Sequence, residues 1–178
     1  VSVGADGGTH QAIEDIAITR VIPNLDVISP CDSLEAKRAT IAIAKTTKPT
    51  YLRLAREKTP IITTEETPFE IGKAQIYWLP DSGLAQVGII ATGALLYRAL
   101  VAAKELEKEG IKVKVMNLSS IKPIDSESII SLAKETKKIV TVEEHQIAGG
   151  MGSAVAEVLA QNFSVPIEFV GVRDKFGQ

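Results

Sequence analysis

The second half of the sequence alternates short apolar runs with amphipathic stretches. Apolar runs at 87–91, 113–118, 139–142 and 167–170 predict buried strands. Between them, residues 93–109, 126–136 and 153–160 carry apolar side chains at helical spacing, as Leu96, Leu100 and Ala103 do. Strands that alternate with helices are typical of βαβ units, so we expect four parallel strands joined by right-handed helical crossovers.

The first third of the chain is predicted to hold a partial unit of the same kind. A helix is expected over 9–20, a strand over 25–29, a helix over 32–44 and a strand over 50–55. Asp32 with Glu35 three residues later forms a pair that suits the start of the second helix. Residues 57–68 hold two prolines and no helical period, and residues 69–78 resemble an edge or lead-in strand.

These patterns together predict an α/β protein. We expect an incomplete first α/β domain at 1–57, a linker at 58–68, and a mostly parallel, helix-flanked second domain at 69–178.

Charge and composition exclude some classes of partner. The formal net charge is −2 and the isoelectric point is about 5.8, so we expect neither nucleic acid nor an anionic membrane as a partner. No apolar run approaches the roughly 20 residues of a membrane span, and the first residues lack the features of a signal peptide. Cys31 is the single cysteine, which rules out an internal disulfide and favours a reducing, cytoplasmic location.

The residues richest in chemical information are 4–11 (GADGGTHQ), just before the first predicted helix. Glycines let a backbone approach a ligand closely, and a helix start offers unpaired N–H groups to an anion. Asp6 adds an acceptor for a hydroxyl group, and His10 adds a titratable donor. The same residues also fit an ordinary loop capped by Thr9, with Asp6 and His10 in solvent, and the loop alone leaves both interpretations open.

Longer sequence blocks carry a resemblance to a known family. Residues 6–17 (DGGTHQAIEDIA) and 20–25 (RVIPNL) resemble the transketolase pattern D-G-P-T-H-Q-x-I-E-x-L-A followed by R-x-I-P-N-L. The resemblance continues through 48–56 (KPTYLRLAR), 90–93 (IATG) and 142–153 (VEEHQIAGGMGS) in family order. The chain thus resembles the C-terminal half of a transketolase, namely the end of the pyrimidine-binding domain and a C-terminal domain that lacks its last helix.

The resemblance implies a reaction and the residues that serve it. It implies transfer of a two-carbon ketol unit between sugar phosphates on thiamine diphosphate, as in the pentose phosphate pathway. Asp6 would bind the hydroxyl beside the ketose carbonyl, and His10 and Arg56 would hold the sugar phosphate. A guanidinium suits phosphate because its planar fork pairs with two oxygens and keeps its charge. Arg53, earlier on the same strand, could serve the same role, but Arg56 is preferred because it matches the family position.

The resemblance also implies what this chain does not supply. In this family the Glu that activates the cofactor precedes the D-G-x-T-H-Q block, and the magnesium motif belongs to a separate diphosphate-binding domain. We therefore expect thiamine diphosphate and magnesium to be bound mostly by parts absent from this chain, and we assign no cofactor-binding residue or metal site in it. We expect it to be inactive alone and to act with an N-terminal diphosphate-binding half or subunit, as a homodimer or heterotetramer.

Four details qualify this picture. Gly8 stands where the family usually has Pro, which makes the loop less stiff. Residues 150–155 (GMGSAV) imitate a dinucleotide motif, but Val155 replaces the third glycine, so a close-packed strand–helix turn is favoured. His145 is interpreted as a structural or interfacial residue, and Cys31 as a small buried hydrophobic residue.

Three other functions are left open. The first is that of a deoxyxylulose-phosphate synthase, although residues 52–57 (LRLARE) differ from the R-Y-P-R-G usual there. The second is that of a 2-oxoacid dehydrogenase beta-type subunit, which lacks the T-H-Q. The third is that of a non-catalytic assembly module of a thiamine enzyme.

Overall fold

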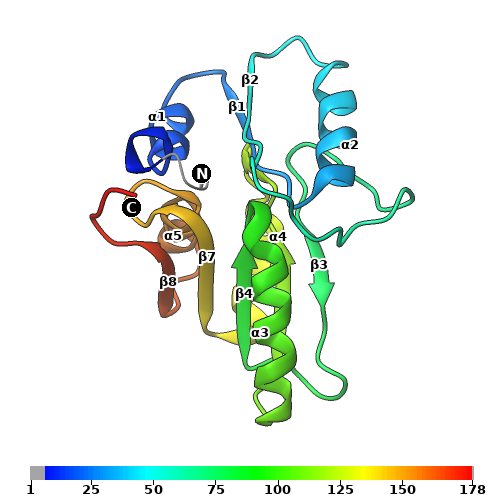
Figure 1. Ribbon diagram of the computed structural model, residues 1–178. Helices are drawn as coiled ribbons and strands as arrows, with labels where there is room; N and C mark the ends of the chain where they lie inside the picture. The colour runs from blue at the N-terminus through cyan, green and yellow to red at the C-terminus, as the bar shows by residue number, and fades with distance from the viewer. Residues whose placement is uncertain (1–6, 178) are drawn as a thin grey trace.

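The order of helices and strands follows from a computed structural model that describes residues 7–177. Figure 1 shows these elements along the chain. They are η2 (Gly8–His10), α1 (Asp15–Arg20), β1 (Asp26–Ile28), α2 (Ser33–Ile43), β2 (Thr50–Leu52), β3 (Gln75–Trp78), β4 (Val87–Ala91), η3 (Gly93–Leu95), α3 (Leu96–Lys108), β5 (Val113–Asn117), β6 (Ser120–Lys122), α4 (Ser126–Thr136), β7 (Ile139–Gln146), α5 (Met151–Asn162) and β8 (Ile167–Val172). The predicted α/β class is confirmed.

The larger sheet has five strands in the order β3-β5-β4-β7-β8. Strands β5, β4, β7 and β8 are parallel to one another, as expected from the alternation of strands and helices. Strand β3 pairs with β5 in the antiparallel direction and lies at the edge, where the sequence places it. The central strand β4 aligns Ile90 with Met116 of β5 and with Thr141 of β7.

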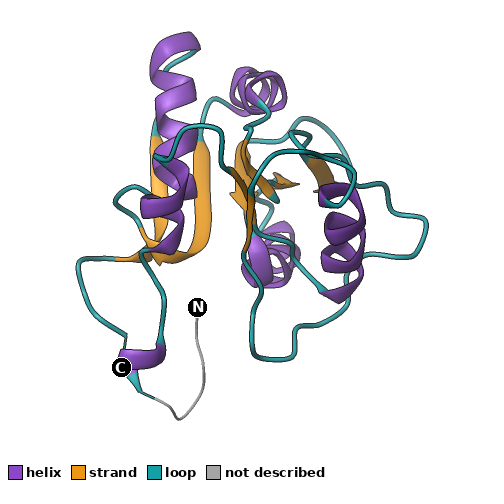
Figure 2. Ribbon diagram, turned by 90° about the horizontal axis from the view of Figure 1, so that it is seen from above, coloured by secondary structure: helices purple, strands orange, loops and turns teal. Residues whose placement is uncertain are grey.

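Helices cover both faces of this sheet, as Figure 2 shows. Helix α3 packs Leu96, Ala99 and Ala103 against β4 and β5 in one apolar cluster. Helices α4 and α5 form a second cluster around Ile90, which is fully buried. Because burial of an apolar side chain of this size stabilises the fold by about 1.5–3 kcal/mol, these two clusters hold the sheet in place.

A smaller sheet joins distant parts of the chain. Strand β1 pairs in parallel with β2 and in the antiparallel direction with β6, giving the order β2-β1-β6. The sequence did not predict β6, because its three residues carry too little pattern and its partner lies far away along the chain. The early strands β1 and β2 therefore share a sheet with a strand that follows β5.

The helix expected over 9–20 is wrong in its first half. Residues Gly8–His10 form one 3-10 turn, and α1 begins only at Asp15. The carbonyl groups of Ala12 and Ile13 do not accept the backbone hydrogen bonds of an α-helix. They accept hydrogen bonds from the Arg53 side chain and from the Gln146 backbone instead. Tertiary contacts thus replace the local bonds that a helix would need.

The start of α2 confirms the predicted pair and extends it. The Asp32 carboxylate accepts from the Glu35 N–H at 2.8 Å, which is an N-cap bond. The Glu35 carboxylate turns back to the Cys31 N–H at 2.6 Å and also accepts from Asn117 and Ser119 near the end of β5. A helix cap therefore also ties the smaller sheet to the larger one.

Asp32 also fixes the irregular segment between the two sheets. Its carboxylate accepts from the Ile62 and Thr63 N–H groups at 2.7 and 2.6 Å and from the Thr63 hydroxyl at 2.9 Å. Burial alone would raise the pKa of Asp32, but these hydrogen bonds, with that of Glu35, outweigh burial and lower the pKa below its ordinary 3.8. Residues 62–63 are thereby anchored although they form neither helix nor strand.

We predict that Asp32→Ala lowers the free energy of unfolding by about 2–3 kcal/mol at pH 7, because it leaves several buried N–H groups without an acceptor. The pKa of Asp32 is lowered by folding, so its contribution is complete above the ordinary pKa and disappears as the pH falls through the folded one. Urea denaturation should therefore show a smaller difference between variant and wild type at pH 3. Glu65→Ala, an exposed change in the same segment, is the control and should stay within about 0.5 kcal/mol. An equally small loss of unfolding free energy for Asp32→Ala would contradict the role of Asp32 in holding residues 62–63.

Candidate functional site

The predicted substrate loop is described from Gly7 onward, and Asp6 lies outside the described residues. His10 ends the short η2 turn, where its side chain is exposed and its Nδ1 lies 3.1 Å from the Thr9 hydroxyl. The His10 N–H donates to the Gly7 carbonyl, which closes the turn. His10 is therefore presented to solvent by a compact turn and not by a helix.

Arg56 lies in the stretch of chain that follows β2. It is exposed and lines a cavity of about 540 Å³ together with Pro30, Cys31, Leu54 and Ile61. The walls of this cavity do not include His10. The two predicted phosphate ligands thus do not both line this cavity.

Arg53 has a structural role that separates it from Arg56. Its side chain is only 6% exposed and forms a two-pronged ion pair with Asp15, from Nε at 2.7 Å and from Nη2 at 3.0 Å. Nη2 also donates to the carbonyls of Ala12 at 3.1 Å and Glu144 at 2.9 Å. Protein acceptors thus already occupy this guanidinium, whereas the choice of Arg56 as the phosphate ligand stays a prediction.

Electrostatics around Asp15 follow from this arrangement. Burial would raise the pKa of Asp15, but the hydrogen bonds and charge of Arg53, with the Tyr51 hydroxyl at 2.8 Å, lower the pKa below its ordinary value. Burial and the Asp15 carboxylate in turn raise the pKa of Tyr51 to about 12. Asp15 is therefore a carboxylate, and Tyr51 a neutral donor, over the whole physiological range.

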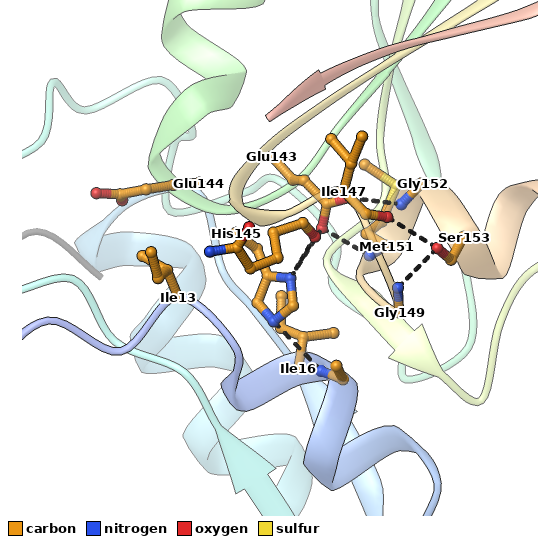
Figure 3. A network of polar contacts seen from close by, with 12 residues as sticks. Ile13, Ile16, Glu143, Glu144, His145, Ile147, Gly149, Met151, Gly152 and Ser153 are labelled. Carbon is orange, nitrogen blue, oxygen red and sulfur yellow. Dashed lines mark hydrogen bonds and ion pairs between the residues drawn. The ribbon is translucent and has the colours of Figure 1, made fainter. Parts of the chain in front are cut away.

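His145 is buried at the end of β7 and contacts α1 (Figure 3). Its Nε2 accepts from the Ala17 N–H at 3.3 Å, and its Nδ1 lies 2.7 Å from the Gln146 carbonyl. These partners require a proton on Nδ1 and a lone pair on Nε2, which is one neutral tautomer. His145 thus caps the first turn of α1, and the structural interpretation of this residue is supported.

The glycine-rich turn before α5 is filled by a carboxylate. Glu143 is 2% exposed and accepts from the N–H groups of Met151 at 2.6 Å and Gly152 at 2.8 Å, as Figure 3 shows. Burial raises the pKa of Glu143, and the two N–H groups oppose this shift. The N-terminus of α5 therefore holds an internal anion, and the favoured interpretation as a close-packed turn, not a dinucleotide site, is supported.

Cys31 is a buried free thiol next to the start of α2. Burial raises its pKa strongly, and the nearby Glu35 carboxylate raises it further. The interpretation of Cys31 as a small buried hydrophobic residue is confirmed, because its side chain is 1% exposed and packs in the apolar cluster with Ala91 and Leu96.

The end of the described chain lies beside the predicted substrate loop. The Gln146 side chain donates to the Lys175 carbonyl at 2.6 Å and accepts from the Asp174 N–H at 3.0 Å. A Cβ atom built at Gly8 would collide with the Gly177 carbonyl. The absence of a side chain at Gly8, where the family usually has Pro, therefore leaves room for the backbone of Gly177.

Neither a metal centre nor a membrane span emerges from the described part of the chain. Among residues 7–177, no group of three or more His, Cys, Asp or Glu side chains is arranged to hold a metal ion. None of the helices in that range is long and apolar enough to cross a membrane.

Comparison with known proteins matches the two parts of the chain to two domains of one family. Residues 1–61 match the family described as the transketolase pyrimidine binding domain, and residues 77–177 match the transketolase C-terminal domain. The chain is 40% identical over its whole length to the 6-deoxy-6-sulfo-D-fructose transketolase subunit SqwH of Clostridium sp. (strain MSTE9), of which it covers 54%. It is 36% identical over 98% of its length to one of the subunits of the apulose-4-phosphate transketolase of Phocaeicola vulgatus, of which it covers 55%.

A solved structure gives the same result in three dimensions. The structure titled "Split gene transketolase, inactive beta4 tetramer" superposes with a TM-score of 0.90 at 40% identity, over 96% of this chain and 56% of that one. The chain thus spans about half the length of the relatives that it matches.

We predict that Gly152→Ala lowers the free energy of unfolding by about 1–3 kcal/mol, although alanine is the better helix former. A Cβ atom at this position would lie 2.6 Å from the Thr141 hydroxyl oxygen and 2.8 Å from the Phe169 ring. Thermal and urea denaturation measure the effect. Gln161→Ala, an exposed change in the same helix, is the control and should alter stability by less than about 0.5 kcal/mol. A variant as stable as wild type would show that the turn is not close-packed.

Proposed function

The chain belongs to the transketolase family, and from this premise we propose that it supplies the sugar-phosphate-binding part of an enzyme that transfers a two-carbon ketol unit. The observation that carries the proposal is the match of both family domains, in order, over nearly the whole chain. We place the boundary of these domains in residues 58–68, with the first domain at 1–57 and the second at 69–178.

The proposed roles rest on side-chain chemistry and on exposure. His10 is an exposed imidazole on a short turn, and Arg56 is an exposed guanidinium on a cavity wall. Both groups suit the oxygens of a phosphate, and the planar guanidinium fork can pair with two of them. We propose that His10 and Arg56 hold the sugar phosphate and that Asp6 binds the hydroxyl beside the ketose carbonyl.

The names of the relatives support an anionic substrate. One relative is named for a sugar with a sulfo group and another for a sugar phosphate. Both groups carry a negative charge and oxygen acceptors, which an arginine fork recognises. This supports an anionic sugar as the substrate class of this chain without choosing the sugar, so the pentose phosphate pathway remains one candidate context.

Cofactor binding requires a second part of the enzyme. Thiamine diphosphate, when bound, supplies the nucleophile and the electron sink of ketol transfer. Among residues 7–177, no group of three or more His, Cys, Asp or Glu side chains is arranged to hold a metal ion, and the family resemblance assigns the magnesium motif to the diphosphate-binding domain. We propose that a diphosphate-binding half provides this site and that this chain binds and orients the sugar.

The proposed assembly contains at least one such half for each copy of this chain. The solved relative is titled as an inactive tetramer of its beta chain, which supports the view that such chains associate and lack activity on their own. A homodimer of a longer protein and a heterotetramer of two subunits both satisfy the proposal.

In the assembled enzyme, His10→Ala or Arg56→Ala should lower kcat/KM for a phosphorylated ketose donor about ten- to a hundredfold, chiefly through KM. The expected loss of a charge-assisted hydrogen bond, about 1.5–3 kcal/mol, sets this range. Steady-state kinetics with a phosphorylated donor and with hydroxypyruvate measures it, because hydroxypyruvate has no phosphate and should be affected much less.

Two controls sharpen the test. Lys45→Ala removes an exposed charge elsewhere and should change neither substrate by more than about twofold. The chain without its diphosphate-binding half should show no turnover. Equal losses with both donors in the His10 and Arg56 variants would overturn the assignment of these residues to the phosphate. Ketol transfer by the chain alone would overturn the proposal that a separate diphosphate-binding half is needed.

A further inference from the structure

The segment that follows His10 is held by distant parts of the chain. The carbonyl of Ile13 accepts from the Gln146 N–H at 2.7 Å, and the carbonyl of Ala12 accepts from Arg53 at 3.1 Å. Further along, within α1, the Ala17 N–H donates to His145. The position of the His10 turn is therefore set by the end of β7 and by Arg53, because residues 11–14 form no regular helix or strand of their own.

Arg53 is the side chain at which these parts meet. It contacts Asp15 at the start of α1, the Ala12 carbonyl in the lead-in segment and the Glu144 carbonyl on β7. Its own N–H donates to the Ile28 carbonyl at 2.8 Å, which continues the pairing of β2 with β1. One buried residue thus connects α1, both sheets and the segment next to the substrate loop.

Arg53 lies three residues before Arg56 in the sequence, which relates these contacts to the proposed phosphate site. Arg56, the second proposed phosphate ligand, follows Arg53 on the same stretch of chain that leaves β2. The backbone of Arg53 therefore fixes where the stretch with Arg56 begins, while its side chain fixes the segment just after His10. The spacing of His10 and Arg56 therefore depends in part on Arg53.

We infer that Arg53 is a positioning residue for the sugar-phosphate site, which sets His10 and Arg56 relative to each other without touching the substrate. The inference rests on the proposed function, because it concerns the same site. It also assigns a task to the C-terminal part of the chain. Three groups at the end of β7 hold the region that follows His10 by hydrogen bonds. They are the Glu144 carbonyl, the Gln146 N–H and the His145 side chain.

The geometry requires arginine and not merely a positive charge. The bonds leave from Nε and Nη2 of one planar group toward acceptors on three elements. A lysine ammonium is a single point charge and cannot reach all of these acceptors at once. Arg53→Lys therefore keeps the positive charge next to Asp15 but loses some of the hydrogen bonds that hold residues 11–14.

The test compares Arg53→Lys with Arg20→Lys. Arg20 also joins α1 to the α5 region, through Glu157 at 2.6 Å and the Gly149 carbonyl at 3.4 Å, and these side-chain bonds do not involve residues 11–14. In the assembled enzyme, Arg53→Lys should raise KM for a phosphorylated donor about tenfold. It should leave kcat with saturating hydroxypyruvate within about twofold, and Arg20→Lys should alter neither.

A second measurement uses this chain alone and does not depend on activity. Hydrogen exchange of the amides at residues 10–13, read by mass spectrometry or NMR, should be at least about tenfold faster in Arg53→Lys and unchanged in Arg20→Lys. Because Arg53→Lys changes a buried residue, Tyr51→Phe provides a milder variant. It removes only the hydroxyl bond to Asp15 and should move KM in the same direction by a smaller factor.

The outcomes separate the inference from the proposed function. If the wild-type assembly transfers no ketol unit, the proposed function fails, and the exchange measurement alone decides whether Arg53 positions the loop. If the wild type is active but Arg53→Lys changes KM equally for both donors, or leaves exchange at 10–13 unchanged, the positioning role is overturned. A lower thermal stability without a KM difference would likewise show that Arg53 has a structural role only.

Discussion

The buried ion pair between Arg53 and Asp15 is the constraint on which the rest of the site depends. Both side chains are under a tenth exposed, so each charge needs the other together with further hydrogen bonds. Tyr51 satisfies the carboxylate, and two backbone carbonyls satisfy the guanidinium. Such a pair adds little net stability compared with apolar residues, but removal of one partner costs about 3–5 kcal/mol. Through it, the Arg53 side chain contacts α1, the segment before α1 and β7.

The same region shows why the two sheets form one structure. Strand β6 from the later part of the chain completes the smaller sheet, and Glu35 links the start of α2 to Asn117 and Ser119. At the end of β7, His145 accepts a hydrogen bond from the Ala17 N–H of α1. Each link crosses from the pyrimidine-type part to the C-terminal part. The part of the chain that matches the transketolase C-terminal domain therefore contacts the segment that follows the predicted substrate loop.

Most of the framework could be predicted from the sequence, because its signals are local. The bounds of β4 and α4 agree with the apolar run at 87–91 and the helical spacing at 126–136. The short strand β6 and the interrupted helix before α1 could not be predicted, since both depend on partners far along the chain. At the site, the family motif indicated His10 and Arg56, whereas the role of Arg53 could not be read from it. An arginine that binds phosphate and one that binds a buried aspartate look alike until their neighbours are known.

A double-mutant cycle on the unfolding free energy tests the central claim most directly, with Asp15→Leu, Arg53→Met and the double variant at pH 7. If the ion pair fixes the junction, each single change leaves an uncompensated buried charge and should cost about 3–5 kcal/mol. The double variant should then cost about 2–3 kcal/mol less than the sum of the two, because it leaves no unpaired charge. Losses that add to within about 0.5 kcal/mol would show that the two residues act independently, and the account of the site would be wrong.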